Sequence, residues 1–497
     1  MSLPPIIHSR RIAAVVSGLL LPLAFAPFGL YWLAPLSLAA LFLLWEQQSP
    51  RESAILGCCY GVGAFALGTY WLHISLRQLG GAPIPIVVLL MSALVLAMSA
   101  YTALTGFLAA RIAPAPGVVR WLVVLPAVWT LVEWLRGWFL TGFPWLSLGY
   151  SQTDTPLFAW APLFGVYGIS WVVALLAGFL VLLLRGGDLR RRLLSGAGIL
   201  GIVFASWQLQ QISWTQPRAV SLRVGLVQAA IPQELKWNAA QRQPTLDYYR
   251  ETTLALDTPD LVIWPEAAIP ALPFEVEDFL DELDDAMAEQ GTQLYSGILT
   301  FDPERREFRN TLMGFGAHTG QYYKRHLVPF GEYFPVPGFV AHWLRLMNLP
   351  SEDVTAGPDG QPPLQVNGIA IAPTVCYEVA FGAEQLGFFP AAELLVNISN
   401  DTWFGDSIAP HQHLQMARMR AIETGRPLLR ATNTGITAVI AADGRIVQSI
   451  AQFEPGVLTA EVHPYSGMTP YIRYGNAAIV LWCSLLLLLC AARLRAM

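Results

Sequence analysis

The stretch IAPTVCYEVAFG, residues 371–382, carries the feature from which the rest of the sequence is best understood. It begins as a short apolar run, which is typical of a buried β-strand, and the run ends in a cysteine, Cys376. Two other stretches have the same form: LVIWPEAAIP (261–270) carries Glu266, and YYKRHLVPFGE (322–332) carries Lys324. Because ligands of α/β folds bind at the edge where strands end, we expect these three side chains to meet there.

A carboxylate, an amine and a thiol supply a base, a cation and a nucleophile, which suffice for acyl transfer through a thioester. Glu266 would take the thiol proton of Cys376, and Lys324 would supply positive charge to the tetrahedral intermediate. A helix predicted from about Val379 would add the partial charge of its N-terminus, which favours the thiolate. Any one of these residues alone is better explained as a buried ion pair or a core thiol, so the hypothesis depends on all three lying at strand ends of one domain.

The segment around these residues, 218–465, has the pattern of one α/β domain. Strands are predicted at 220–229, 260–265, 292–299, 309–317, 321–325, 368–376, 393–400, 427–433, 437–444, 445–450 and 457–462, and helices at 239–256, 276–290, from about 379, and at 408–425. Strands alternate with helices first and then pair with one another. This order predicts a mixed sheet with helices outside, two layers of each.

The flanks of this domain are apolar enough to cross a membrane. The 497 residues are 54% hydrophobic and 13% charged, with a mean hydropathy of +0.46, which is too apolar for an ordinary soluble protein. Spans are predicted near 12–25, 30–45, 54–73, 84–110, 119–135, 165–184, 194–210 and 475–492. Residues 1–217 would thus form a bundle of seven spans, and residues 466–497 would hold the eighth.

The arginines outside the predicted domain orient this bundle. Eleven of them fall on the side of the N-terminus and three on the other side, which is a strong positive-inside signal. Both termini are therefore expected in the cytoplasm and the α/β domain on the opposite face. The first apolar run ends in Ala24-Phe25-Ala26, which has the form of a cleavage site, but Pro27 directly after it is unfavourable for cleavage; the run is therefore interpreted as an uncleaved anchor rather than a signal peptide.

Composition also excludes some partners and ligands. Thirty of the 35 acidic residues lie in the predicted domain, and an acidic domain argues against a nucleic-acid partner. Cys376 is its only cysteine, so the thiol can stay free even in an oxidising compartment. His411 and His413 have no further ligands at suitable spacing, so no metal site is predicted. The chain has only two lysines, Lys236 and Lys324.

The motifs around the three residues resemble a known family. WPE at Glu266, YxKxHLVPFGE at Lys324, CYE at Cys376 and NISNDTWFG from Asn397 are similar to motifs of the nitrilase superfamily. With seven predicted spans before the domain and one after it, the whole chain resembles the bacterial apolipoprotein N-acyltransferase family, the membrane-embedded members of that superfamily. The resemblance implies a polytopic helical membrane domain of about eight spans and a four-layer αββα sandwich.

This resemblance also implies roles for individual residues. Glu266 would be the general base, Lys324 the cation that stabilises the oxyanion, and Cys376 the nucleophile. The further site residues that it implies are Glu332, which positions the triad, Tyr377 and Glu378, which shape the site, and Trp237, which contacts lipid on a loop. No cofactor is implied.

The implied reaction has two halves. Cys376 takes an acyl chain from a membrane phospholipid, and the α-amino group of an S-diacylglyceryl-cysteine at the N-terminus of an apolipoprotein then accepts it. The family resemblance further implies a monomer in the bacterial inner membrane whose catalytic domain faces the periplasm.

Two features admit more than one interpretation. The apolar segment Phe330–Pro350 is either a local core or, as we favour, a lid beside the site; Trp343, Leu344, Leu346 and Met347 are then the candidate lipid contacts. Glu133 in the fifth predicted span is either a functional acid or, as we favour, the partner of Arg136 in an i,i+3 ion pair.

Two other functions use the same features. An envelope-anchored amidase or nitrilase would need the same three residues, but eight spans and the apolar segment argue against a small-molecule hydrolase. A transporter with an outer regulatory domain would need polar residues within the spans, and Glu133 is nearly the only one.

Overall fold

The computed structural model describes residues 5–185, 187–334 and 354–496. By its internal contacts the chain divides into two units. We call Met1–His73, Ile84–Ser213 and Arg473–Met497 the helical unit, and Ile74–Pro83 and Trp214–Ile472 the α/β unit.

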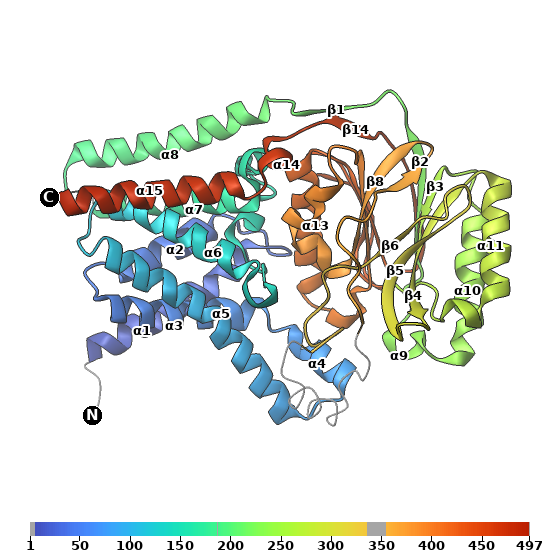
Figure 1. The fold of residues 1–497 in the computed structure, drawn as a ribbon. Coiled ribbons are helices and arrows are strands. Elements are labelled where there is room, and N and C mark those ends of the chain that lie inside the picture. Colours follow the sequence, from blue (N-terminus) through green and yellow to red (C-terminus); the bar gives the residue numbers. More distant parts are fainter. Residues whose placement is uncertain (1–4, 186, 335–353, 497) are drawn as a thin grey trace. The chain divides into compact units, whose positions relative to one another are not determined.

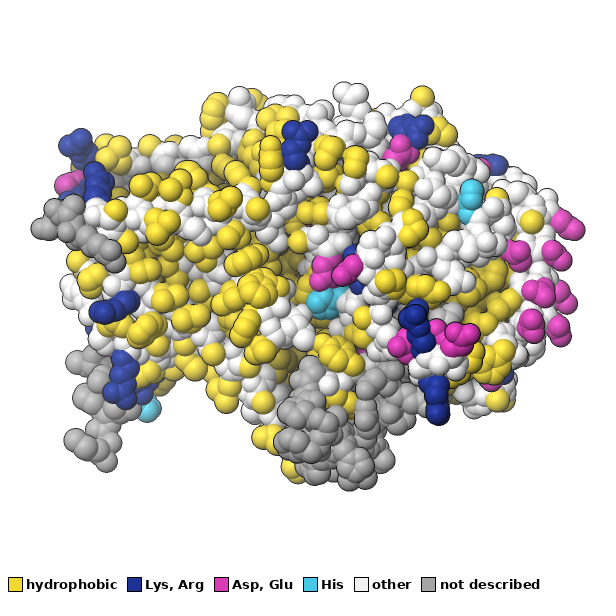
Figure 2. All heavy atoms as spheres, viewed as in Figure 1, with side chains coloured by type: hydrophobic (Ala, Val, Ile, Leu, Met, Phe, Trp, Pro, Cys, Tyr) yellow, Lys and Arg dark blue, Asp and Glu magenta, His cyan; other side chains and the backbone are white. Residues whose placement is uncertain are grey.

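The helical unit has a helix at each of the eight predicted spans. They are α1 (Pro5–Leu20), α2 (Leu33–Leu44), α3 (Pro50–Gly68), α5 (Ile84–Ile112), α6 (Leu125–Arg136), α7 (Ala161–Arg185), α8 (Leu189–Gln210) and α15 (Ala477–Ala496). Among the described residues, three helical stretches are long and apolar enough to cross a membrane: Ile84–Ile112, Pro156–Arg185 and Leu189–Gln210. Hydrophobic side chains cover the visible face of this unit (Figure 2), and the chain is a membrane protein. That the other five helices also cross stays a prediction.

Small residues let helix α3 approach its neighbours closely. A Cβ at Gly63 would lie 2.2 Å from the carbonyl oxygen of Val15 in α1, and one at Gly57 would lie 2.5 Å from that of Thr102 in α5. Neither position can hold a side chain unless the helices move apart. Such contacts are the usual way in which helices pack in a bilayer, where no hydrophobic effect drives them together.

The interpretation of Glu133 as the ion-pair partner of Arg136 is confirmed. Their side chains are 4.0 Å apart and almost fully buried. Arg136 donates to the carbonyl oxygens of Phe143 (2.7 Å) and Trp145 (2.5 Å), and a Glu133 oxygen accepts from the backbone N–H of Leu148 (3.1 Å). The pair therefore ties the end of α6 to the loop that follows it.

The α/β unit contains two six-stranded sheets. One has the order β13-β2-β3-β4-β5-β6 and the other the order β12-β11-β10-β9-β8-β7. The strands of the first are β13 (Gly456–Val462), β2 (Leu222–Gln228), β3 (Leu261–Ile263), β4 (Gln293–Asp302), β5 (Glu307–Phe315) and β6 (Gln321–Tyr323). Those of the second are β12 (Ile446–Ile450), β11 (Thr437–Ile440), β10 (Leu428–Thr432), β9 (Leu394–Ser399), β8 (Ile369–Val375) and β7 (Leu364–Val366). A short ribbon of β1 (Thr215–Pro217) and β14 (Tyr465–Gly467) completes the unit.

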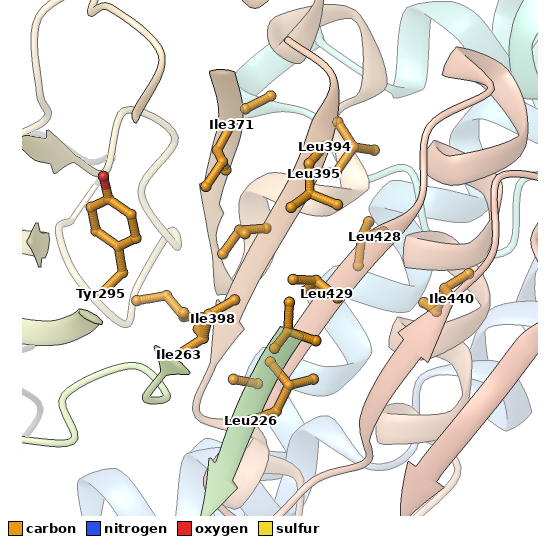
Figure 3. Packing of buried hydrophobic residues seen from close by; sticks show 14 of the residues in the cluster. Leu226, Ile263, Tyr295, Ile371, Leu394, Leu395, Ile398, Leu428, Leu429 and Ile440 are labelled. Atoms are coloured by element: carbon orange, nitrogen blue, oxygen red, sulfur yellow. The ribbon is translucent and has the colours of Figure 1, made fainter. Parts of the chain in front are cut away.

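Helices cover the outer faces of both sheets, as predicted. Figure 1 shows α10 (Ala239–Leu254) and α11 (Glu277–Gln290) outside the first sheet, and α13 (Ala409–Thr424) outside the second. Between the sheets, buried side chains such as Leu226 and Leu429 form one apolar core (Figure 3). The unit is therefore a four-layer αββα sandwich.

The outer helices follow from local sequence. In α11 the buried residues Phe279, Leu283 and Met287 recur every four positions, so they form one stripe that packs on the sheet. The opposite face carries the acidic side chains that Figure 2 shows gathered on this helix. Gly291 ends the helix in the left-handed conformation (φ 66°), which glycine adopts without strain.

The prediction of an α-helix from about Val379 is wrong. The chain forms two short 3-10 segments instead, Cys376–Ala380 and Gly382–Phe388. Gly382 and Gly387 each disfavour an α-helix by about 1 kcal/mol, and a Cβ at Gly382 would lie only 1.8 Å from a guanidinium nitrogen of Arg420. No α-helix N-terminus therefore acts on the thiol, and that part of the argument for a thiolate fails.

Candidate active site

The three predicted residues each follow the end of a strand. Lys324 comes directly after β6 and Cys376 directly after β8, and Glu266 lies three residues beyond β3. All three are buried in the α/β unit, with relative exposures of 7% for Glu266, 1% for Lys324 and 6% for Cys376. The strands thus deliver an acid, an amine and a thiol to the interior of one unit.

The Lys324 amine lies between two carboxylates. Its Nζ donates to Glu332 at 2.9 Å and lies 3.6 Å from Oε1 of Glu266. Burial by itself disfavours the charge, but the two carboxylates outweigh it and raise the pKa of Lys324 above its ordinary value. Lys324 is therefore a permanent cation in this site, and Glu332 lies where the sequence predicted a positioning acid.

Asn310, which the sequence analysis missed, joins the two carboxylates. Its side-chain amide donates to Oε1 of Glu266 (2.7 Å) and to Glu332 (3.2 Å), and its own carbonyl oxygen accepts from the backbone N–H of Lys324 (2.8 Å). The only available signal was a polar amide near the start of the predicted strand RNTLMGFGA. Asn310 fixes both acids relative to the amine.

The stretch NISNDTWFG holds the other oxygen of Glu266. Oε2 accepts from the backbone N–H of Asn400, just beyond β9, at 2.8 Å. Both carboxylate oxygens of Glu266 are thus held by donors that come from different strands. A carboxylate held in this way has a fixed direction, as a general base requires.

Cys376 sits on a strained turn. Its φ is +53°, a left-handed conformation that non-glycine residues seldom adopt and that is often found at functional sites. Burial, and next the negative charge of Glu266, raise the pKa of the Cys376 thiol, while Lys324 opposes this rise. The thiol is therefore protonated at neutral pH and needs a base before it can act as a nucleophile.

His413 contacts the main chain of this turn, at the carbonyl oxygen of Cys376. Burial, and next the Arg430 guanidinium, lower its pKa, so the ring is neutral. Its Nε2 lies 3.1 Å from the carbonyl oxygen of Cys376, which can only accept, so Nε2 carries the proton. Its Nδ1 lies 3.0 Å from both the Arg430 guanidinium and Oδ1 of Asp401; with the proton on Nε2, Nδ1 accepts from Arg430.

Asp401 and Asn397 complete the support. Arg430 donates to Asp401 at 2.7 Å and also to the side-chain oxygen of Asn397, whose amide reaches the Cys376 carbonyl at 3.4 Å. The sequence analysis weighed His413 only as a metal ligand and missed Asp401 and Arg430. In the described ranges, no group of three or more His, Cys, Asp or Glu residues is placed to hold a metal ion.

His413→Phe is expected to slow acylation of Cys376 about tenfold, because the buried carbonyl of the strained turn loses a donor worth about 1–2 kcal/mol. The neighbouring His411 is the matched control, since its Nε2 lies 3.0 Å from the amide of Gln452 and makes no contact with the thiol turn. His411→Phe should stay within about twofold of wild type. The rate of thioester formation on Cys376 from a defined phospholipid measures both; equal rates for the two variants would contradict the support role.

Glu378 connects the strand ends that carry Lys324 and Cys376. Its carboxylate accepts from the hydroxyl of Tyr322 (2.9 Å) and from the backbone N–H groups of Arg325 (2.7 Å) and Val375 (2.7 Å). Burial raises the pKa of Glu378, whereas these backbone donors oppose the rise. Its position fits the predicted supporting role.

The remaining predicted residues divide into two groups. The Tyr377 ring packs edge-on against Phe381 at 4.9 Å, beside the thiol turn, and Trp237 follows the short helix α9 (Gln233–Lys236) with 51% of its surface exposed. The four predicted lipid contacts of the apolar segment lie outside the described residues; they are Trp343, Leu344, Leu346 and Met347.

Family models match both parts of the chain. The family model described as Carbon-nitrogen hydrolase matches residues 223–470, so the α/β unit and its buried acid, amine and thiol define a protein of the carbon–nitrogen hydrolase class. A second model, Apolipoprotein N-acyltransferase N-terminal domain, matches residues 17–179. Among solved structures, a carbon-nitrogen hydrolase from Helicobacter pylori is similar, with a TM-score of 0.36 and 16% identity over 49% of this chain and 89% of that chain.

Curated relatives match almost the whole chain. The apolipoprotein N-acyltransferase of Methylococcus capsulatus is 42% identical, covering 97% of this chain and 96% of the relative. That of Vibrio cholerae is 40% identical, covering 96% and 95%. The chain therefore belongs to the apolipoprotein N-acyltransferase family, and it is an acyltransferase.

Proposed function

We propose that the protein transfers an acyl chain from a membrane phospholipid to the α-amino group of the S-diacylglyceryl-cysteine at the N-terminus of an apolipoprotein. The observation that carries the proposal is the buried thiol turn of Cys376 beside the Glu266–Lys324 pair, in a chain whose near-full-length relatives are apolipoprotein N-acyltransferases. The same relatives favour transfer over the amidase and transporter alternatives, because they share the helical part as well as the α/β part.

The first half-reaction forms a thioester. Glu266 takes the proton of the Cys376 thiol, and the sulfur attacks the ester carbonyl of the phospholipid. Lys324 stabilises the oxyanion of the tetrahedral intermediate. When the intermediate collapses, the bond to the glycerol oxygen breaks, Glu266 returns its proton to that oxygen, and a lysophospholipid leaves.

The second half-reaction uses the acceptor amine. The α-amino group attacks the thioester carbonyl, again with the oxyanion beside Lys324, and Glu266 takes the proton that the nitrogen loses. The carbon–sulfur bond breaks, an amide forms, and the proton returns to Cys376. Glu332 and Asn310 position these groups throughout, because Glu332 holds the Lys324 amine and Asn310 joins Glu332 to Glu266.

Mass spectrometry of the purified enzyme tests this proposal. Incubation with a phospholipid of one defined acyl chain should add the mass of that acyl group to the peptide that contains Cys376. Addition of a diacylglyceryl-cysteine peptide should then remove the adduct and yield the N-acylated peptide. A stable enzyme without any adduct, or an adduct that water removes as fast as the peptide does, would exclude the transferase mechanism.

We further propose where this chemistry takes place. Residues 1–217 and 466–497 would form eight membrane spans, and the catalytic domain, 218–465, would face the periplasm from the bacterial inner membrane. Trp237 and the segment with Trp343 and Leu344 would contact lipid. The enzyme would act as a monomer.

Cysteine labelling in spheroplasts tests the orientation. A cysteine at Asp359, in the exposed turn GPDGQPP, should react with a membrane-impermeant maleimide, whereas one at the exposed Asp188, before α8, should not. Gln361 in the same turn is less suitable because its amide makes two hydrogen bonds to the backbone of Tyr323. The unsubstituted chain, with its five native cysteines, gives the background. The opposite labelling pattern would overturn the orientation.

A further inference from the structure

Both lysines of the chain are buried in the α/β unit. Lys324 has a relative exposure of 1% and Lys236, the last residue of α9 (labelled in Figure 1), of 3%. The residues on either side of Lys236 are exposed: Leu235 by 43% and Trp237 by 51%. A lysine normally keeps its ammonium in water. This chain uses arginine elsewhere and buries its only two lysines in one unit, so the cost of burying each of them must be offset by a specific interaction.

The Lys236 ammonium contacts the main chain, not the carboxylate, of the catalytic base Glu266. Its Nζ donates to the main-chain carbonyl oxygen of Glu266 at 3.0 Å. This is its only hydrogen bond to the part of the chain that the structure describes. An ammonium has three N–H donors, so two of them have no described protein acceptor, although the group is almost fully buried. A buried charge with so few partners is costly unless another charge compensates for it.

The compensating charge at rest is the Glu266 carboxylate, and the Cys376 sulfur adds a second one only when it is ionised. The groups that act electrostatically on Lys236 are Glu266, on the loop after β3, and Cys376, at the end of β8. Burial lowers the pKa of Lys236 to about 8, while these two groups oppose that change. Lys236 is therefore charged at neutral pH and becomes neutral in mildly alkaline solution.

The charge balance of the site requires a second cation. Lys324 contacts both Glu332 and Glu266, so these three groups together carry one net negative charge. The thiolate and then the oxyanion must therefore form in a site that already carries a net negative charge, which makes them more costly. With Lys236 included, the four groups are neutral at rest. When the proton of Cys376 has moved to Glu266 they carry one net positive charge, which the oxyanion then balances.

We propose that Lys236 is a second cation of the acyl-transfer site, which lowers the cost of the anions formed during the reaction and holds the Glu266 backbone in place. This inference rests on the proposed function of Cys376. It makes Lys236 a positioning and electrostatic residue, whereas the residues assigned above would still carry out the bond-making steps.

The test compares Lys236→Met with wild type in thioester formation from a defined phospholipid in detergent micelles. Methionine has a similar shape and no charge. At pH 7 the variant should form the thioester at least about tenfold more slowly. The wild-type rate should fall as the pH rises through about 8, because Lys236 loses its charge there, and the variant should lack this fall. The matched control is Glu234→Gln, an exposed charge on the same helix, which should keep the wild-type rate and profile.

Each outcome decides the inference. A Lys236→Met rate within twofold of wild type, or a slow variant that keeps the alkaline fall, would show that the lysine only fills space. If thermal unfolding shows that Lys236→Met does not fold, the pH dependence of the wild-type rate of thioester formation decides. A wild-type rate that does not fall between pH 7 and about 9.5 overturns the inference. Failure of wild type itself to form a thioester on Cys376 would instead overturn the proposed function.

Discussion

Cys376→Ala is expected to reduce acyl transfer by at least about a thousandfold, because no other group in the site can form the thioester. Alanine keeps the Cβ, so the strain of the left-handed backbone at φ +53° is the same in both proteins, whereas glycine would relieve it. Loss of one buried sulfur should cost about 1 kcal/mol of stability or less. Activity with a phospholipid and an acceptor peptide, measured beside thermal unfolding, separates loss of chemistry from loss of fold.

Cys376→Ser is the sharper version of the same experiment. It keeps a nucleophilic atom and the shape of the site, but the alcohol has a much higher pKa than a thiol, and burial raises the pKa even of the thiol. Glu266 is too weak a base for that proton, so we expect this variant to be nearly inactive as well. Substantial turnover by either variant in purified form would remove Cys376 from the mechanism.

Much of the fold could be predicted because it follows from local pattern. The apolar runs predicted most strands, although the three-residue strands β1, β7 and β14 were missed. The helices predicted at 239–256, 276–290 and 408–425 are confirmed as α10, α11 and α13. The division into two sheets was harder to predict, because β2 pairs with β13, more than two hundred residues later in the chain. Alternation along one strand does not reveal which distant strand lies beside it.

The catalytic candidates could be predicted from local sequence, whereas the residues that support them could not. Glu266, Lys324 and Cys376 stood out because each is a reactive side chain at the end of a predicted strand. Asn310 lies in a strand interior and Asn400 acts through its backbone N–H, so neither has a side-chain pattern that marks it.

The helix wrongly predicted after Cys376 has a partly local cause, because Gly382 and Gly387 are visible in the sequence, and tertiary packing adds a second constraint. The space that a side chain at Gly382 would need is filled by Arg420, which comes from α13 and is almost fully buried. This constraint comes from tertiary packing and is absent from the local sequence. The support of Cys376 by His413, also on α13, was missed for the same reason.

Lys324→Ala is expected to abolish acyl transfer and also to destabilise the α/β unit. Without the amine, the carboxylates of Glu266 and Glu332 share the amide of Asn310 with no cation between them. Removal of one partner from a buried charge pair costs about 3–5 kcal/mol, so loss of activity alone would not distinguish a catalytic from a structural role. Lys324→Arg should keep less than about a tenth of the wild-type rate. Only 1% of the Lys324 surface is exposed, so the larger planar guanidinium has no room in its place.

A double variant separates the two roles of Lys324. Glu332→Gln keeps the shape of that side chain but removes its charge, so Lys324→Ala with Glu332→Gln leaves only one buried carboxylate and should be more stable than Lys324→Ala alone. Thermal unfolding should show this recovery, while thioester formation on Cys376 should stay absent, because no cation remains beside the oxyanion in the position that Lys324 held. If stability and thioester formation recovered together, Lys324 would be needed only to hold two acids apart, and the stabilisation of the oxyanion would have to come from the other buried lysine, Lys236.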